Sequence, residues 1–396
     1  MDTTLPVSPS AFNFTRRLFK ERTLFAVAAI AVIAYALEHT LVSGGKSLAI
    51  IAAIALILAI VGLAVRITHH AEVLAEKVGD PYGSMILTLS AVLVEVVILA
   101  IVMGHSDNPA LAKSTIFSAL MIDINLILGL AALAGGLKHG EQIYNDDSGR
   151  VYTVMILVAV AFSMILPNFI PHANWKTYSV LTIAVMVLMY AMFLRMQTKE
   201  HSYFFHFNYP RHEAKLRAAQ ARLDKRMVQS IEDDQLVVED EEEFEHESAR
   251  FSAMMLVAGV IITGFLAEVM AMTMNVSIAG TAIPPIFMAM LVAGISASPE
   301  ILTAVRAAMA NRYQNVINIS LGAALSTVIL TIPVVEAVAL FTGQPIDMGL
   351  TTAESVMILI TLIVAWMNVA DGEANAIEGM THVVLFIAFI ALAFLG

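Results

Sequence analysis

Apolar residues in this chain come in blocks of about twenty, the length of helix that spans the ~30 Å hydrocarbon core of a bilayer. Period-two alternation of apolar and polar residues is absent. Because backbone polar groups in lipid must be paired within helices or a closed barrel, the pattern predicts an all-α integral membrane protein. The eleven expected transmembrane helices cover residues 24–42, 47–67, 83–103, 113–136, 151–170, 177–196, 251–274, 284–309, 314–341, 351–369 and 381–395.

Composition agrees with a membrane location and excludes several classes of protein. Of 396 residues, 59% are hydrophobic and 14% are charged, whereas soluble domains average ~45–50% and ~25%. The chain has no cysteine, which excludes disulfide frameworks, thiolate metal sites and cysteine nucleophiles. The net charge of −11 argues against a nucleic-acid partner.

The distribution of Lys and Arg gives the expected orientation. If the N-terminus lies in the cytoplasm, three of the 22 basic residues fall outside: Lys46, Lys113 and Lys176. The other nineteen fall inside, as the positive-inside rule requires. Basic residues between 16 and 22 lead directly into a full-length span, so we expect no cleavable signal peptide. The expected location is a bacterial inner membrane, with the C-terminus outside.

One long hydrophilic segment, 197–250, divides the chain. It is basic at first and ends in a segment, 231–247, that holds ten acidic residues. It is either a solvated cytoplasmic linker or a surface that collects cations. The expected units are 1–46 with the first helix, a five-helix repeat at 47–196, the linker at 197–250 and a second five-helix repeat at 251–396.

Two helices on opposite sides of this linker have similar sequences. Leu89-Ser90-Ala91-Val92-Leu93-Val94-Glu95 and Gly294-Ile295-Ser296-Ala297-Ser298-Pro299-Glu300 each bring a glutamate to mid-membrane, one turn after a serine. The small residues that begin the next helix follow at similar distances, at Ser118 and Gly322. Because five is an odd number, the second repeat enters the membrane from the opposite side, as in many secondary transporters.

Glu95 and Glu300 are the main candidates for a cation site. A charge at the bilayer centre costs ~2.5–3.5 kcal/mol or more, so such residues normally face a cavity or a partner. The alternative is a protonated glutamate that is hydrogen-bonded between helices. Ca²⁺ prefers ~6–8 oxygen ligands from carboxylates, carbonyls and water. Since Pro299 has no N–H, the carbonyl of Ile295 loses its helical partner, and we expect it to turn toward the ion.

The same pair of carboxylates can carry protons. A bound cation displaces protons from carboxylates, so competition at one pair, together with alternating access, produces antiport without a separate proton path. Supporting groups are expected among nearby polar and acidic side chains: Ser90, Asp123, Asn125, Glu268, Ser296, Ser298 and Ser326.

Other acidic and histidine residues have less specific interpretations. Glu38 and Glu336 fall near the outer ends of spans, where we expect a solvated rim. Glu354 begins the tenth span, where a helix dipole favours an acid. His69 and His70 form either an interfacial pair or a pH sensor.

Two blocks of residues carry a family resemblance. The first block contains His70-Ala71-Glu72-Val73-Leu74-Ala75, Gly79-Asp80-Pro81-Tyr82-Gly83-Ser84 and Glu95-Val96. The second contains Ser298-Pro299-Glu300, Asn318, Gly322 and Thr331-Ile332-Pro333-Val334-Val335. In this order and spacing they resemble the bacterial calcium (sodium/potassium)–proton antiporters of the calcium:cation antiporter superfamily.

The resemblance implies eleven helices, two inverted five-helix repeats, cation binding at Glu95 and Glu300, and an acidic segment between the sixth and seventh helices. The vacuolar branch has an asparagine before each acid and a glutamine in the second repeat. Here the asparagine amides are missing, and Ser326 stands at the glutamine position.

We therefore expect a transporter that exchanges cytoplasmic Ca²⁺ for protons, with Na⁺ or K⁺ exchange as the alternative. Ca²⁺ enters as the transported ion, and no cofactor is expected. A passive cation channel would have a single filter and symmetric subunits. An intramembrane protease would need paired aspartates, a serine–histidine set or HExxH. The sequence therefore favours a transporter over an enzyme.

Overall fold

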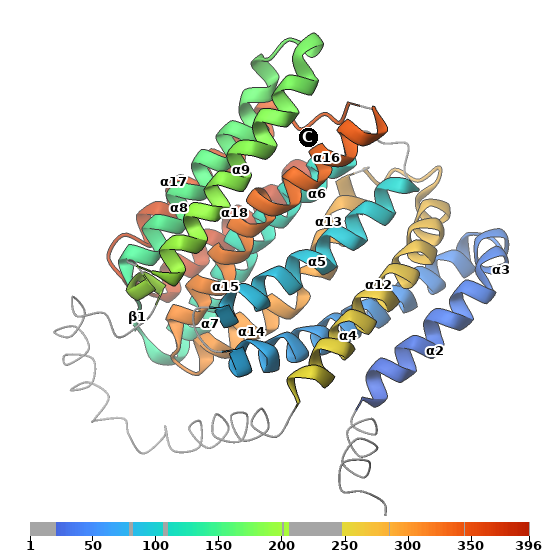
Figure 1. Cartoon of the computed structure of the whole chain (residues 1–396), viewed down its shortest axis with the longest axis horizontal. Coiled ribbons are helices and arrows are strands. Elements are labelled where there is room, and N and C mark those ends of the chain that lie inside the picture. The colour runs from blue at the N-terminus through green and yellow to red at the C-terminus, as the bar shows by residue number, and fades with distance from the viewer. Residues whose placement is uncertain are drawn as a thin grey trace, which may run out of the picture.

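The computed structural model describes residues 21–78, 82–105, 110–199, 202–205, 248–284, 286–343 and 345–395. These residues are nearly all helical (Figure 1). The acidic segment 231–247 and the basic residues before Glu21 lie outside the described residues. The α-helices are α2 Arg22–Ala36, α3 Glu38–Ser43, α4 Lys46–Val78, α5 Tyr82–Gly104, α6 Leu111–Met121, α7 Leu128–His139, α8 Asp146–Val160, α9 Trp175–Thr198, α12 Ala249–Ile278, α13 Ile286–Ser296, α14 Ser298–Met309, α15 Tyr313–Ser326, α16 Ile332–Thr342, α17 Thr352–Asn368 and α18 Ala376–Leu395.

Shorter elements join or interrupt these helices. They are the π-helical segments η1 Ile122–Ile127, η2 Ala161–Ile165 and η7 Thr327–Thr331, the 3₁₀ turns η3 Leu166–Phe169, η4 His172–Asn174 and η5 Ser202–Phe205, and the strands β1 Gln142–Ile143 and β2 Glu373–Ala374.

Each predicted span coincides with helical structure. Seven described helices are long and apolar enough to cross a membrane, or eight if the bent pair α13–α14 is one span. Three apolar helices within the other predicted spans are shorter: Arg22–Ala36, Thr88–Gly104 and Thr352–Asn368. The structure therefore confirms a multi-spanning helical protein, while the count of eleven crossings stays a prediction.

Five of the predicted spans are interrupted within the described residues, the fourth and fifth of them by the π-segments η1 and η2. The first is divided into α2 and α3 at Leu37. The pair α13–α14 is bent by 53°, immediately before Pro299, which has no N–H to continue the helical ladder. In the ninth span the π-segment η7 precedes Pro333, for the same reason. Such π-segments are frequent at functional sites.

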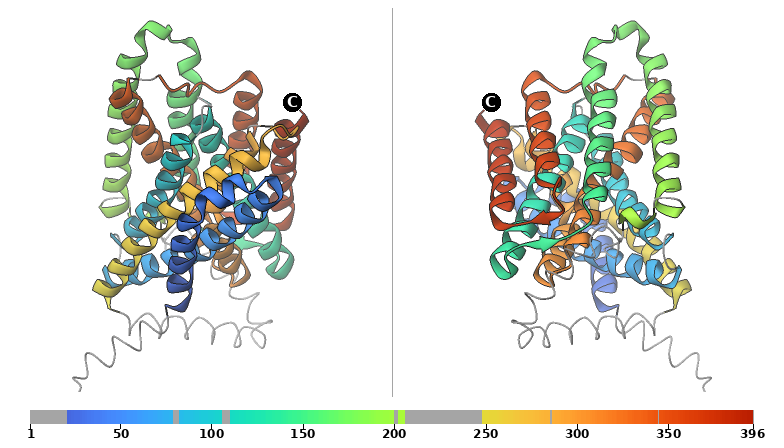
Figure 2. Two further views of the ribbon diagram at one scale, coloured as in Figure 1. Left: turned by 90° about the vertical axis from the view of Figure 1, so that its right-hand side faces the viewer. Right: turned by 90° about the vertical axis from the view of Figure 1, so that its left-hand side faces the viewer.

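The connections meet on two opposite faces (Figure 2). The end of α9 and the start of α12 lie on the face that we call the linker face. On this face β1 pairs antiparallel with β2, and the Asn145 N–H donates to Gln314. On the opposite face Lys113 donates to the Gly349 carbonyl, and the Leu350 N–H donates to Met164.

Apart from the bond between Leu350 and Met164, which lies within the fifth span, each of these contacts joins residues at connections that the predicted alternation of eleven spans assigns to the same side. The two-residue strands β1 and β2 were not predicted, because their pairing joins distant connections. Pairing of this kind leaves no periodic pattern in the sequence.

The two halves of the chain interlock. Along the molecule α4 packs against α12, and α5 packs against both. Helix α7 of the first half packs against α18, the last helix of the second half, and α9 of the first half packs against α16 of the second. Glycines allow the close approaches: an added Cβ at Gly259 would lie 2.6 Å from Ile67. Small residues are typical of such interfaces in membranes.

Candidate cation-binding site

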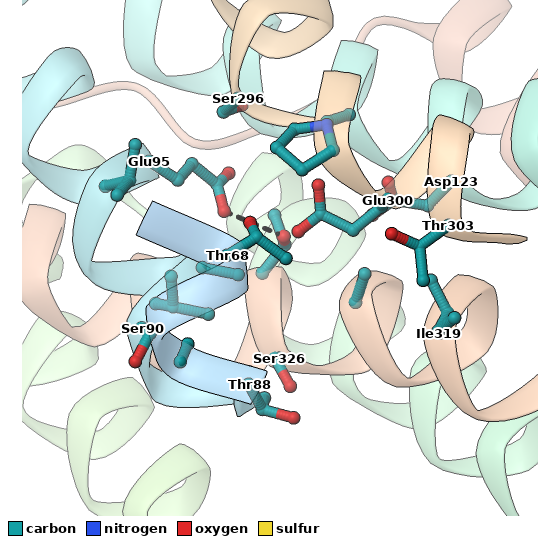
Figure 3. Close-up of a pocket in the computed structure, with 18 of the residues that line it drawn as sticks. Thr68, Thr88, Ser90, Glu95, Asp123, Ser296, Glu300, Thr303, Ile319 and Ser326 are labelled. Atoms are coloured by element: carbon teal, nitrogen blue, oxygen red, sulfur yellow. Dashed lines mark hydrogen bonds between the residues drawn. The ribbon is translucent and has the colours of Figure 1, made fainter. Parts of the chain in front are cut away.

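Glu95 and Glu300 point toward one another from α5 and α14 (Figure 3). Glu95 lies within α5 and is 6% exposed. Glu300 lies in the first turn of α14, directly after Pro299. The bend before Pro299 therefore places a helix N-terminus inside the molecule, and its partial positive charge favours an ionised carboxylate there.

Each glutamate has one buried oxygen that the described residues leave without a hydrogen-bond partner. The second oxygen of Glu95, Oε2, accepts a hydrogen bond of 3.0 Å from Thr327. Glu95 Oε1 and Glu300 Oε2 are buried and have no such partner. A buried carboxylate oxygen without a partner is costly. The pair is therefore suited to a proton or a cation that would complete both oxygens.

A cavity of about 320 Å³ surrounds the two glutamates. Four acidic residues line it, Glu72, Glu95, Asp123 and Glu300, and the lining residues that the structure describes include no Lys, Arg or His. Such a set of charges raises the local concentration of cations.

Hydroxyl groups line the same cavity. Ser90 donates to the Ile86 carbonyl at 2.7 Å, and Ser326 donates to the Gly322 carbonyl at 2.7 Å. Ser296 donates to a carbonyl of its own helix at 3.0 Å. Because a hydroxyl oxygen has two lone pairs, each of these groups keeps acceptor capacity on the cavity side. Ser90, Ser296 and Ser326 thus lie where the sequence predicted supporting oxygens.

Three other predicted supporting residues do not line the cavity, and the assignments are corrected here. Ser298 donates to the Ile295 carbonyl at 2.7 Å, which occupies one of the two lone pairs of that oxygen, and a role of this carbonyl toward an ion stays a prediction. Asn125 is fully buried away from the cavity, where it donates to Thr361 at 2.9 Å and contacts His382. Glu268 of α12 is not among the lining residues.

Asp123 does line the cavity, beyond Glu300 from Glu95 (Figure 3). It lies in η1 and is 3% exposed. Thr327, the hydrogen-bond partner of Glu95, was not predicted. It lies in η7, at the position that the repeat spacing aligns with Asp123. The repeat comparison places Thr327 opposite Asp123, but a threonine within an apolar span is not unusual enough to be assigned to the site from sequence.

Within the described ranges, no group of three or more His, Cys, Asp or Glu side chains is arranged to hold a metal ion. A cation between Glu95 and Glu300 would therefore take further oxygens from hydroxyls, carbonyls or water, as Ca²⁺ does in many proteins.

The cavity extends to the linker face. Its lining includes Glu72 near the end of α4, Gln197 near the end of α9, and Asn318 near the start of α15. Phe205 of η5 also lines it, and its carbonyl accepts a hydrogen bond of 3.1 Å from Asn318. None of these residues at the cavity mouth is a charged residue within a predicted span, so the sequence did not assign them to the site.

Two acids outside the cavity test other predictions. Glu354 forms a capping box with Thr351 at the start of α17, as its position at the first turn predicted. Glu336 was expected at a solvated rim, and this was wrong. It is 5% exposed and accepts a hydrogen bond from Ser179 of α9, because α9 covers this side of α16.

Comparison with known families gives a match to most of the chain. The family described as "Sodium/calcium exchanger protein" matches residues 48–199 and 251–395. The two matched blocks leave out the hydrophilic segment between them. The expected division of the chain into two five-helix units stays a prediction.

Among curated proteins, the sodium-potassium/proton antiporter ChaA of Escherichia coli is 30% identical over 348 residues, which cover 85% of this chain and 88% of that protein. A Ca²⁺/H⁺ antiporter of Aphanothece halophytica is 24% identical and covers 84% of this chain and 88% of that protein. These relatives are transporters, and their names include both divalent and monovalent cations.

Solved structures share the fold. The structure titled native YfkE superposes with a TM-score of 0.70 at 17% identity, and covers 94% of this chain and all of that chain. The H⁺/Ca²⁺ exchanger CAX superposes with a TM-score of 0.58 at 15% identity, over 97% of this chain and 90% of that one.

Proposed function

Because the chain belongs to the sodium/calcium exchanger protein family, we propose that it exchanges cytoplasmic Ca²⁺ for protons by alternating access in a bacterial inner membrane. The observation that carries this proposal is the facing pair Glu95 and Glu300. Each has a buried oxygen that lacks a partner among the described residues, in a cavity lined by acids and hydroxyls.

Exchange follows from competition at this pair. A divalent cation that binds both carboxylates is attracted most strongly when both are ionised. Protons that reach the same oxygens neutralise the pair and release the cation. Since the two ligands occupy the same atoms, each passage of the cation in one direction is coupled to passage of protons in the other.

Two inverted five-helix repeats account for alternating access. Support comes from pairs of equivalent contacts: a helix of the first half packs against a helix of the second half, and the corresponding helix of the second half packs against the corresponding helix of the first. The span containing η1 packs against α18, and the span containing η7 packs against α9. Glu95 of the first half is bonded to Thr327 of the second, while Asp123 of the first half lies beside Glu300 of the second (Figure 3).

The cavity corresponds to an inward-open state in the proposed orientation, because it extends to the linker face and nineteen of 22 Lys and Arg residues lie on the predicted cytoplasmic side. A state that opens to the opposite face would complete the cycle.

Exchange of Na⁺ or K⁺ is the second candidate. Two observations favour it: the similarity to the sodium-potassium/proton antiporter ChaA, and the absence of Asn125 from the lining, which removes one expected amide oxygen from the surroundings of the glutamates. A smaller number of strong oxygen ligands reduces the preference for Ca²⁺.

The test uses inside-out vesicles that hold a proton gradient, with Ca²⁺, Na⁺ and K⁺ added in parallel. We expect Ca²⁺ to dissipate the gradient in vesicles with the wild-type protein. Glu95→Gln and Glu300→Gln should each reduce this response to the level of empty vesicles, since a neutral amide cannot exchange a proton for a cation. Glu268→Gln is the matched control, because Glu268 lies outside the cavity, and it should retain the response.

Failure of all three cations with the wild-type protein would exclude antiport. A response that persists in both cavity variants would exclude the assigned site. A response to Na⁺ or K⁺ but not to Ca²⁺ would identify the monovalent cation as the substrate in place of Ca²⁺.

A further inference from the structure

Glu336 is a buried carboxyl group that the exchange site does not use. It lies on α16, six residues before the end of the helix at Thr342, and accepts a hydrogen bond from Ser179, the fifth residue of α9. Both positions are close to the face opposite the linker face. Neither residue is among those that line the cavity.

Two buried hydroxyls lie between Glu336 and the exchange site. Helix α9 starts at the opposite face, and the continuous span α15–η7–α16 ends there, so the two run antiparallel and pack against each other. With Ser179 beside Glu336, this antiparallel register sets Thr182 of α9 about 3 Å along the helix axes from the level of Thr331 of η7, at the α-helical rise. Both threonines are 0% exposed, and neither hydroxyl has a hydrogen-bond partner among the described residues.

The series of oxygen atoms that begins at Glu336 and Ser179 ends at Thr327, beside the exchange site. Thr327 lies one turn before Thr331 in η7 and donates to Glu95 at 3.0 Å. From Thr327 to Glu336 is nine residues, or about 13 Å at the α-helical rise. Polar oxygens therefore occur at each turn between Glu95 and a carboxyl near the opposite face.

Buried hydroxyls without partners cost free energy, and sites of this kind usually hold ordered water or serve a function. A water molecule between Thr331 and Thr182 would satisfy both hydroxyls. Intramembrane carboxyls connected by hydrogen-bonding groups are typical of proton relays.

We propose that Glu336, with Ser179, Thr182, Thr331 and Thr327, forms a proton route between the opposite face and Glu95 that does not pass through the cavity, in place of the shared path expected from the sequence. Coupled exchange requires that this route conducts protons only when the cavity is closed to the linker face. The proposal rests on the function proposed above. The carboxyl of Glu336 gives its proton to the next oxygen, each hydroxyl or water accepts one proton and passes on another, and the carboxylate of Glu95 receives one. Glu336 then takes a proton from water at the opposite face.

The charged and titratable groups around Glu336 are few. Among the described residues, Tyr178 of α9 interacts electrostatically with Glu336, and its hydroxyl donates to the Phe162 carbonyl. The segment η7 and the rest of α16 contain no titratable side chain.

The test separates proton movement from cation movement in proteoliposomes. One assay measures Ca²⁺-driven proton flux with a pH-sensitive dye. The other measures exchange of radioactive Ca²⁺ for Ca²⁺, which needs no proton. We expect Glu336→Gln to slow proton-coupled exchange by about 10²-fold, the usual range for a positioned proton-transfer group. Exchange of Ca²⁺ for Ca²⁺ should be unchanged, and Glu336→Asp should restore much of the proton flux.

Thr331→Val provides a second variant that keeps the shape of the side chain, and it should lower the proton flux alone. The proposal is overturned if both fluxes fall by the same factor in these variants, which would indicate a packing role, or if neither falls. Glu95→Gln should abolish both fluxes, because Glu95 belongs to the exchange site itself. If the wild type lacks both fluxes, the proposed function fails. If only the Glu336 and Thr331 variants behave differently from expectation, the proposed route alone fails.

Discussion

Glu95, Glu300, Glu336 and Glu354 all lie in or at the end of apolar helices, but their oxygens have different partners. Glu354 caps its own helix, and Glu336 is bonded to Ser179. Glu95 and Glu300 each keep a buried oxygen that no described residue completes. The sequence identifies all four as unusual acids, yet only the arrangement of neighbouring helices shows which of them retain binding capacity.

A second residue-level feature is Glu21, which precedes α2 and links it to α4 on the linker face. It is 1% exposed and accepts hydrogen bonds from Arg66, one of them 2.8 Å from Nε. His70 Nε2 lies 3.3 Å from the same carboxylate. Burial raises the pKa of Glu21, but the hydrogen bonds from Arg66 and His70 outweigh it and lower the pKa from 4.5 to about 2.

This lowered pKa predicts a pH-dependent stability. A carboxyl whose pKa is lower in the folded state stabilises the fold above pH 4.5, and the stabilisation is lost as the pH falls toward 2. We expect Glu21→Gln to reduce the free energy of unfolding by about 1.5–3 kcal/mol at pH 7, the range for hydrogen bonds to charged groups.

The measurement is the thermal midpoint of both proteins in detergent across pH 3–8. The difference between them should shrink below pH 4.5. A difference that is constant across this range would contradict the assignment.

At the scale of helices, the blocks of apolar residues predict where the helices lie, but they predict less well where a helix is interrupted. Pro299 and Pro333 indicate where α14 begins and where η7 ends. The sequence around η1 contains no proline, and the structure offers no simple local reason for the π-turn that includes Asp123 and Asn125. Because a π-turn rotates the residues after it, helical periodicity could not predict that Asn125 faces α17 and α18 rather than the cavity.

Close packing of α7 against α18 predicts sensitivity at one glycine. An added Cβ at Gly379 would overlap the backbone nitrogen of Leu133 and lie 2.8 Å from the Gly129 carbonyl. We expect Gly379→Ala to destabilise the protein by about 1–3 kcal/mol, as overpacking does.

Gly62→Ala is the control, because no atom lies within 4 Å of a Cβ at Gly62. Alanine there should be neutral or stabilising by up to about 1 kcal/mol. Equal thermal midpoints for the two variants in detergent would contradict the close contact.

At the scale of the molecule, the two faces predicted from Lys and Arg agree with the contacts between connections. β1–β2 pairing and the bond between Asn145 and Gln314 occur on one face, and the Lys113–Gly349 bond occurs on the other. Contacts of this kind could not be predicted, since they depend on side chains in connections that are far apart in the sequence. The assignment of one face to the cytoplasm stays a prediction from the distribution of Lys and Arg.

Because the chain has no cysteine, single cysteines can test this orientation. Glu141→Cys and Arg250→Cys, on the linker face, should react with a membrane-impermeant maleimide only in inside-out vesicles. His172→Cys and Thr281→Cys should react only from the other side. All four side chains are exposed. Labelling of both pairs from one side would contradict the alternation of spans.

The fit of α7 against α18 also has a consequence for biogenesis. Gly129 and Asn125 are synthesised well before their partners on α18, Gly379 and His382, and His382 lies 257 residues after Asn125. Until α18 is in place, the Asn125 carbonyl oxygen lacks its contact with His382, although Thr361 of α17 already accepts a hydrogen bond from the amide nitrogen. The first half therefore reaches its final packing at Asn125 and Gly129 only when α18 of the second half has been added.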